Sequence, residues 1–198
     1  MKKLFTIILL VLAISFSYSQ ESNFYLAIGG AYATTGGDFD EPYENGFALN
    51  LGLGFRLNNT WGLTANLGSA GHPMEDTDSA LGVAVLSVGP MISLGGDKMR
   101  WDFKPQYGFN MKGVWRGDDL GDFADLTGID MEDWELSGTA IVLGNSLVFG
   151  GSNKGFTFSI DVDYVMGEFD EISDSTGSAD LEMKYKSWRL GAGVRLNF

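Results

Sequence analysis

The sequence of 198 residues contains no cysteine and only one histidine. Without cysteine the chain cannot form disulfides, bind a metal through thiolates or carry a lipid on a cysteine at a signal cleavage site. A single histidine gives little support to a histidine-based active site, because a catalytic nucleophile needs its base within hydrogen-bond reach.

Basic residues are also scarce. There are 13 lysines and arginines against 26 acidic residues, which gives a formal net charge of −13. Removal of an amino-terminal segment that holds Lys2 and Lys3 but no acid would lower this charge to −15. A chain this acidic repels nucleic acid, so we expect no nucleic-acid partner.

One long apolar run is present, at the amino terminus. Leu4 to Phe16 follows Lys2 and Lys3 and precedes the small or polar residues Ser17 to Gln20. This pattern predicts a cleavable secretory signal over residues 1–19, with residues 20–198 as one mature domain. No later segment approaches the roughly 20 apolar residues of a membrane-spanning helix.

The last eleven residues alternate strictly between apolar and polar or small side chains. Trp188, Leu190 and every second residue to Phe198 fall on one face, whereas Arg189, Arg195 and three small or polar residues fall on the other. A period of two predicts a β-strand. Two arginines and two glycines suit the wall of a narrow lumen, which leaves the apolar face for lipid.

The same alternation recurs along the chain. We predict eight strands, over residues 23–35, 45–57, 60–70, 80–95, 99–115, 135–149, 156–170 and 188–198. Pro90 and Pro105 cannot donate to a ladder, and we expect them nearly opposite each other, where one shared bulge absorbs both.

The predicted connections alternate in length. Those at 58–59, 95–98 and 150–155 are short and rich in glycine, asparagine and serine, as hairpin turns require. Those at 36–44, 71–79, 116–134 and 168–182 are long. Short turns at one rim and long loops at the other are typical of outer-membrane barrels, in which the turns and both termini are periplasmic and the loops extracellular.

The chain resembles the small eight-stranded outer-membrane proteins of Gram-negative bacteria, the class that contains OmpX and the transmembrane domain of OmpA. The resemblance rests on the strand pattern and on the ending Gly193-Val194-Arg195-Leu196-Asn197-Phe198, which looks like the signal read by the barrel-assembly machinery. It implies an all-β, eight-stranded antiparallel up-and-down transmembrane β-barrel in the cell outer membrane, without cofactor or metal. Lipid, lipopolysaccharide and the assembly machinery are the implied partners. Because the chain ends at Phe198, we expect no peptidoglycan-binding domain of the OmpA type.

Eight charged residues fall on the predicted inner face. They are Arg56, Asp102, Lys104, Lys112, Asp161, Asp163, Arg189 and Arg195. An eight-stranded barrel has room inside only for side chains, so these charges must pair or retain water. A charge-paired plug is the favoured interpretation, and a small gated pore is the alternative.

Most of the acidic residues lie in the four long connections. A solvated anionic rim explains them, and binding of a basic protein partner or of divalent cations are the sharper alternatives. Asp38, Asp40 and Glu44 are spaced somewhat like a calcium loop but lack its glycine and its final glutamate. In the third connection, Leu120, Phe123, Leu126 and Ile129 recur at helical spacing and predict a short amphipathic turn at the barrel mouth.

Two lysines and two sets of aromatic residues fall on the predicted outer face. Lys184 and Lys186 lie toward the loop end of the last strand, where we expect contacts with lipopolysaccharide phosphates. The aromatic residues predict two interfacial girdles. One girdle is Trp61, Trp101, Phe156 and Phe198, and the other is Phe47, Trp115, Tyr164 and Trp188.

The sequence therefore predicts a non-enzymatic barrel whose role is structural or depends on a partner bound at its acidic loops. Three alternatives stay open: a narrow channel, a lipid hydrolase built on a serine and a histidine, and a secreted soluble ligand-binding barrel. The hydrolase would have to use His72 with Ser69 or Ser79, without any Gly-x-Ser-x-Gly motif. The soluble barrel would need an apolar interior, which the inner rows from Asp102 to Lys112 and from Thr157 to Asp163 contradict.

Overall fold

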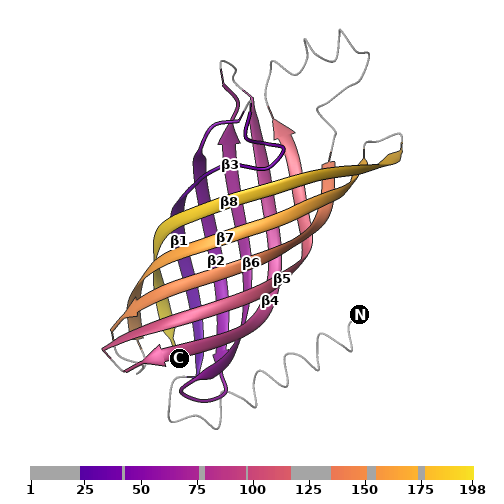
Figure 1. Cartoon of the computed structure of the whole chain (residues 1–198). Coiled ribbons are helices and arrows are strands. Elements are labelled where there is room, and N and C mark those ends of the chain that lie inside the picture. Colours follow the sequence, from indigo (N-terminus) through magenta and orange to yellow (C-terminus); the bar gives the residue numbers. More distant parts are fainter. Residues whose placement is uncertain are drawn as a thin grey trace.

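The computed structural model describes residues 23–41, 43–75, 79–96, 98–116, 135–150, 155–173 and 177–198. In this part of the chain, eight antiparallel strands pair in chain order and β8 pairs with β1, which closes the barrel (Figure 1). The strands are β1 (Phe24–Ala33), β2 (Gly46–Arg56), β3 (Trp61–Pro73), β4 (Ala80–Gly95), β5 (Met99–Arg116), β6 (Glu135–Phe149), β7 (Gly155–Ser173) and β8 (Ser178–Asn197). The predicted fold class is confirmed. The predicted signal over residues 1–19 lies outside the described residues.

The alternating pattern produces a barrel with an apolar outer wall. On β2, Phe47 and Leu49 are 78% and 69% exposed, whereas their neighbour Ala48 is buried. The other strands repeat this arrangement, so leucine, isoleucine, valine and aromatic side chains cover the outside. A belt this apolar is far larger than the patches that water-soluble monomers expose, and it suits the hydrocarbon of a bilayer. No helix in the described ranges has the length and apolar character to cross a membrane.

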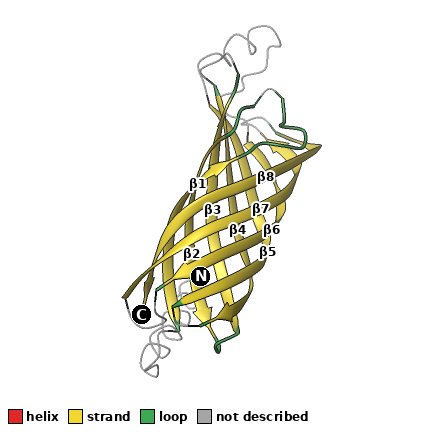
Figure 2. Ribbon diagram, turned by 60° about the vertical axis from the view of Figure 1, so that its left-hand side comes forward, coloured by secondary structure: helices red, strands yellow, loops and turns green. Residues whose placement is uncertain are grey.

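The barrel has two unlike rims (Figure 2). We call the end with the β2–β3, β4–β5 and β6–β7 connections the short-turn rim, and the opposite end the long-loop rim. At the short-turn rim the Phe198 N–H donates to the Phe24 carbonyl at 2.9 Å, and the Arg56 N–H donates to the Asn23 carbonyl at 2.6 Å. Both ends of the described barrel therefore lie at the short-turn rim.

The fourth long connection is a hairpin rather than a loop. The prediction placed residues 168–182 between strands, but β7 continues to Ser173 and β8 begins at Ser178. The pair β7–β8 carries on up to Ser173 and Ser178 with one irregularity at Phe169 and Glu171. Polar side chains line much of this extension, so the apolar alternation that marks a membrane strand is lost there although the backbone pairing continues.

A bulge in β5 reverses the predicted phase of its upper part. Gly108 pairs with Ser87, but Asn110 pairs with Leu86, so Phe109 is an extra residue and the strand turns over. Met111 and Trp115 consequently point inward and are buried, whereas the predicted girdle had Trp115 outside. Trp115 therefore does not belong to the predicted outer girdle, of whose other members Phe47 and Trp188 are exposed.

The two prolines face each other, as predicted, but no bulge forms there. The registers Val88 with Tyr107 and Ile92 with Phe103 are in step on both sides of Pro90 and Pro105. The ladder is interrupted between these pairs, and the bulge lies nearer the long-loop rim. Because the two prolines lie opposite each other, both interrupt the ladder at the same place. Only one short stretch of hydrogen bonds is lost, and the register does not change.

Candidate functional site

A buried ion-pair cluster fills the short-turn end of the lumen. Asp102 is fully buried, and its Oδ1 accepts hydrogen bonds from Arg100 Nε at 2.8 Å and from Ser93 Oγ at 2.7 Å. Its Oδ2 accepts a bond of 2.5 Å from Arg195 Nη1. Both oxygens of this carboxylate are therefore used within the wall of the barrel.

Arg195 also packs against an aromatic ring. Its guanidinium carbon lies 4.9 Å from the centre of the Tyr25 ring, a cation–π contact in a dry setting. The Tyr25 ring lies over Gly54, where a Cβ atom would approach it to 2.1 Å, so only glycine leaves room. Tyr25, Arg195 and Asp102 thus form one packed layer across the lumen.

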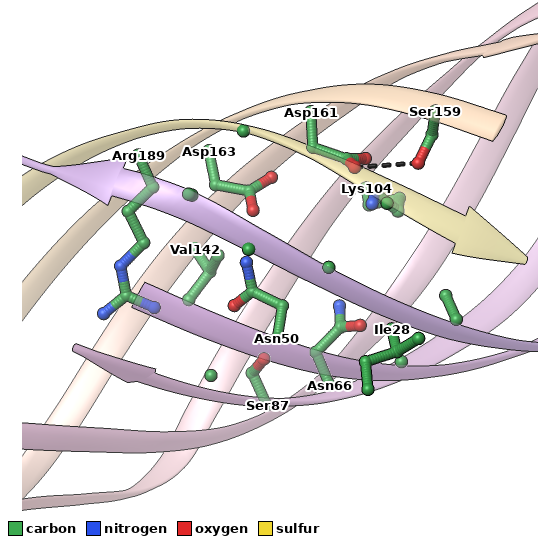
Figure 3. A pocket seen from close by; sticks show the side chains of 18 of the residues that line it. Ile28, Asn50, Asn66, Ser87, Lys104, Val142, Ser159, Asp161, Asp163 and Arg189 are labelled. Carbon is green, nitrogen blue, oxygen red and sulfur yellow. Dashed lines mark hydrogen bonds between the residues drawn. The ribbon is translucent and has the colours of Figure 1, made fainter. Parts of the chain in front are cut away.

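The middle of the lumen is polar and holds a small cavity. Figure 3 shows Asp161, Asp163, Lys104, Arg189, Asn50, Asn66 and Ser87 around it. Its volume is about 50 Å³, room for a few water molecules. Asp161 accepts hydrogen bonds from Ser146 and from Ser159, the latter at 2.8 Å. Asp163 Oδ1 and Arg189 Nε are buried without protein partners among the described residues, so both are placed to bind such water.

Glycines on the wall give these long side chains their space. A Cβ on Gly68 would approach Arg189 Nη1 to 2.7 Å, and a Cβ on Gly144 would approach both Asp163 Oδ1 and Lys104 Cε at 3.0 and 3.2 Å. Small residues opposite large charged ones are how a narrow barrel is filled.

The long-loop end of the lumen is apolar, which the sequence analysis did not predict. Its side chains form one buried cluster, including Leu81, Val83, Met111, Trp115, Leu136, Phe169 and Tyr185. Phe39 comes from the β1–β2 connection, is fully buried, and packs against Phe169 and Tyr185 with ring centres 5.8 and 6.1 Å apart. The connection therefore inserts an aromatic side chain into the mouth and closes it.

A hydrogen bond secures this closure. Trp115 Nε1 donates to the Tyr43 hydroxyl at 2.5 Å, and Thr35 Oγ1 donates to the Tyr43 carbonyl at 3.1 Å. Burial raises the pKa of the Tyr43 phenol, and the hydrogen bond from Trp115 opposes this rise. The phenol is therefore neutral at physiological pH.

Lys112 stands apart from the other predicted lumen charges. The β5 bulge places it on the outer side, where its ammonium contacts Glu135 and donates to Ser137 Oγ at 2.8 Å. Both side chains of the ion pair are more than 40% exposed. The prediction that Lys112 lines the lumen is wrong, because one extra residue in a strand exchanges its two faces. The structure places the other seven predicted residues on the inner side.

His72 is not paired with Ser69 in this arrangement. It is fully buried on the inner side of β3, with Nε2 2.9 Å from the Tyr185 hydroxyl. Ser69 lies on the opposite face of the same strand and is exposed. The two side chains therefore point away from each other.

Exposed carboxylates surround the long-loop rim. We define the acidic rim as the exposed residues Asp38, Asp40, Glu41, Glu44, Glu75, Glu168, Asp170, Glu171, Asp180 and Glu182. Within the described part of the chain, no three or more histidine or acidic side chains are grouped as a metal site would require. Asp38 instead accepts a hydrogen bond of 2.6 Å from the Lys184 N–H, which ties the β1–β2 connection to β8. The predicted helical turn at 120–129 lies outside the described residues.

Comparison with solved structures identifies the fold. Ail of Yersinia pestis, crystallised with the heparin analogue sucrose octasulfate, is 20% identical with a TM-score of 0.54 over 89% of this chain and 100% of its own. Neisserial surface protein A is 14% identical with a TM-score of 0.55 over 91% and 100% of the two chains. The chain has the fold of the small outer-membrane β-barrels. OprG from Pseudomonas aeruginosa is a further match, 12% identical with a TM-score of 0.50 over 90% of this chain and 98% of its own. No family model and no curated protein matches the sequence.

In an outer-membrane barrel, the outer face of β8 near the long-loop rim is the level of lipid headgroups. Trp188 stacks on Tyr164 there, with ring centres 4.4 Å apart. Lys186 and Lys184 are the next outward residues along β8, and both are exposed. Lys184 Nζ is 3.7 Å from Glu182, a loose surface contact that leaves it available.

Replacement of both lysines by glutamine should reduce the lipopolysaccharide that co-purifies with the barrel. A lysine near an anionic surface contributes about 1 kcal/mol, so the pair should change the affinity on the order of tenfold or more. Lys98→Gln, an exposed lysine at the short-turn rim, is the matched control. Equal lipopolysaccharide content in all three proteins would show that Lys184 and Lys186 make no phosphate contact.

Several lumen residues were not among the eight predicted lumen charges, although the predicted inner row of the fifth strand includes Gln106. Arg100, Tyr25 and Gln106 all lie inside the barrel, and Gln106 accepts hydrogen bonds from Asn66 and Ser87 at 2.9 and 3.0 Å. Each occupies an inward position of its strand, so the period of two predicts that its side chain points into the lumen. Phe39 gave no such signal, because it belongs to a connection and not to a strand.

Proposed function

We propose that this chain is a non-enzymatic integral protein of the outer membrane, whose barrel is an anchor and whose acidic rim binds a basic protein partner. The observation that carries the proposal is the contrast between a filled lumen and a rim of ten exposed carboxylates. Because binding specificity in barrels of this kind is carried by loops on a rigid scaffold, the rim is the surface available for function.

The filled lumen argues against the channel alternative. Phe39 and its aromatic neighbours occupy one end, the Asp102 cluster occupies the other, and about 50 Å³ of cavity lies between them. We therefore expect no steady conductance in planar bilayers. Regular ion-conducting steps from the purified protein would restore the channel interpretation.

The β7–β8 hairpin is the best-defined part of the acidic rim. Glu168, Asp170, Glu171, Asp180 and Glu182 all lie on its two strands, so their spacing is fixed by a sheet. This charge is unsuited to a sulfated polyanion of the kind bound to Ail. It favours a lysine- or arginine-rich surface, with association that weakens as salt rises.

A basic peptide tests this proposal. The barrel in lipid vesicles should bind a decalysine peptide at low salt, and changing the five hairpin acids to Asn or Gln should weaken binding on the order of tenfold. Neutralising Asp102 and Asp161 is unsuitable as a control because both lie inside, so we choose Glu135→Gln, an acid already paired with Lys112. A pull-down from outer membranes with the hairpin variant then identifies the partner. An unchanged set of interacting proteins would argue for a purely structural role.

We also propose that the short-turn rim and both termini are periplasmic. The absence of cysteine makes this simple to test, because a single introduced thiol is the only one in the chain. In intact cells a membrane-impermeant maleimide should label Asp40→Cys but not Gly96→Cys, both exposed residues at opposite rims. The reverse pattern would invert the proposed orientation.

The terminal aromatic residue should matter for assembly more than for stability. Phe198 is 41% exposed and its ring centre is 5.7 Å from that of Phe24. We expect Phe198→Ala to lower the amount of folded barrel in cells at least about tenfold. The free energy of folding into vesicles should change by about 1 kcal/mol or less, which is the range for one partly exposed aromatic contact. Phe156→Ala, an exposed aromatic at the same rim, controls for lost lipid contact. Equal assembly of both variants would remove the proposed contact with the assembly machinery.

A further inference from the structure

The inside of the barrel carries surplus positive charge although the chain as a whole is acidic. Five cationic side chains and three carboxylates lie on the inner side in the described residues. They are Arg56, Arg100, Lys104, Arg189 and Arg195 against Asp102, Asp161 and Asp163. The surplus of two charges is opposite in sign to the net charge of −13.

The surplus lies at the short-turn end. In the middle of the lumen, Lys104 and Arg189 are balanced by Asp161 and Asp163. At the short-turn end, Arg56, Arg100 and Arg195 share one fully buried carboxylate, Asp102. A second carboxylate, Asp161, is 3.9 Å from Arg195. Buried charges without compensation are very costly, so this end of the barrel requires an explanation.

At the short-turn end of the lumen, two arginines keep buried donors without a hydrogen-bond partner in the described part of the chain, as Arg189 does beside the central cavity. Both oxygens of Asp102 already accept hydrogen bonds, from Arg100 Nε, Ser93 and Arg195. Arg56 is close enough to Arg100, Asp102 and Arg195 to interact with them electrostatically. Nevertheless Arg56 Nε, Arg56 Nη2 and Arg100 Nη2 are buried without a hydrogen-bond partner among the described residues. Arg56 and Arg100 are only 8% and 7% exposed, so bulk water does not solvate them freely.

We propose that a small inorganic anion of the size of chloride binds between Arg56 and Arg100. An anion there would accept from the unpartnered guanidinium donors and reduce the surplus charge of the cluster. Arg56 ends β2 and Arg100 is the second residue of β5, so both lie beside the short-turn rim. The anion therefore reaches its site from the water at that rim without crossing the lumen. Because Arg56 and Arg100 are only 8% and 7% exposed, a monatomic ion suits this site better than a larger organic acid.

Unfolding in matched salts tests the site. In vesicles of zwitterionic lipid, urea unfolding is compared in sodium chloride and in sodium gluconate at equal ionic strength, because gluconate is too large to enter. The folding equilibrium constant should rise about tenfold once chloride exceeds its Kd about tenfold, since the ion binds only the folded state. The effect should vanish in Arg56→Met and persist in Lys104→Met, whose charge belongs to the balanced middle of the lumen. If Arg56→Met fails to fold, Arg100→Met is the second variant.

Bromide supplies a direct observation. Crystals grown in bromide should show an anomalous peak between Arg56 and Arg100, and absence of this peak would overturn the proposal. The competing partner is a carboxylate of the chain itself. Glu21 and Asp97, which adjoin the described residues Asn23 and Lys98 in sequence, are the candidates. If wild-type unfolding is equal in chloride and gluconate, and Glu21→Gln or Asp97→Asn destabilises as much as Arg56→Met, a carboxylate occupies this role and the proposal is wrong.

Discussion

Asp102→Ala should destabilise the barrel by about 3–5 kcal/mol, because it leaves Arg100 and Arg195 as buried charges without their shared carboxylate. Asp102 is fully buried, and Arg195 is 1% exposed, so water cannot replace the lost partner. Urea unfolding in lipid vesicles measures the loss as a shift in midpoint at constant slope. Asp102→Asn keeps the shape and should lose less, since an amide oxygen still accepts one hydrogen bond.

The exposed ion pair between Lys112 and Glu135 is the matched control. Both side chains are more than 40% exposed, so Glu135→Gln should cost at most about 1 kcal/mol. A small loss in both variants would show that the short-turn end is open to water. The Asp102 cluster would then not close that end of the lumen.

Phe39→Ala should open the other end of the lumen. Removal of a fully buried phenylalanine costs about 3 kcal/mol or more, and this cost falls on the local closure of the β1–β2 connection rather than on the whole barrel. At that cost, opening becomes on the order of 100-fold more frequent. A thiol at Met111, buried beneath the mouth, should therefore react with a water-soluble maleimide about 100-fold faster in the Phe39→Ala background.

Two variants separate loss of the seal from general loosening. Phe39→Leu keeps an apolar side chain in the mouth and should restore most of the protection. Tyr43→Phe removes the hydroxyl that accepts from Trp115 but keeps the ring against Phe39, so its effect should be smaller than that of Phe39→Ala. Equal labelling of Met111→Cys with and without Phe39 would mean that the aromatic side chain does not close the mouth.

The fold could be predicted from the sequence because lipid imposes one rule on every strand. Each outward position in the belt must be apolar, so the period of two extends over whole strands such as Gly46–Arg56 and is visible without an alignment. The strand pairing follows, since short connections allow only neighbouring antiparallel strands. The inward phase of Arg56, Asp102, Asp161, Arg189 and Arg195 was predicted for the same reason.

The period of two no longer predicts the structure outside the part of the barrel that contacts lipid. Beyond the membrane the β7–β8 hairpin is polar on much of its surface, and its extension to Ser173 and Ser178 had no apolar period to reveal it. The bulge at Phe109 likewise had no local marker, so Lys112 and Trp115 were assigned to the wrong faces. The insertion of Phe39 depends on contacts with Phe169 and Tyr185, which lie more than a hundred residues away.

The contact partners of the lumen charges were also beyond the sequence. Alternation placed Asp102 and Arg195 inside, but their meeting across the barrel depends on strand tilt and register. Asp163 and Arg189 are register partners on the neighbouring strands β7 and β8, so their proximity follows from the strand order alone. Their side chains nevertheless line the central cavity (Figure 3), where Asp163 Oδ1 and Arg189 Nε have no hydrogen-bond partner among the described residues.

The central claim is that the apolar wall is built for a bilayer and encloses a filled, sealed lumen. The most direct test is to dilute the urea-denatured mature chain into lipid vesicles and, in parallel, into buffer, and then to run unboiled and boiled samples on a denaturing gel. We predict a compact, faster-migrating and protease-resistant band from the unboiled vesicle sample, which boiling converts to the unfolded position, and aggregation in buffer. A folded, monodisperse protein in buffer without lipid or detergent would contradict the account.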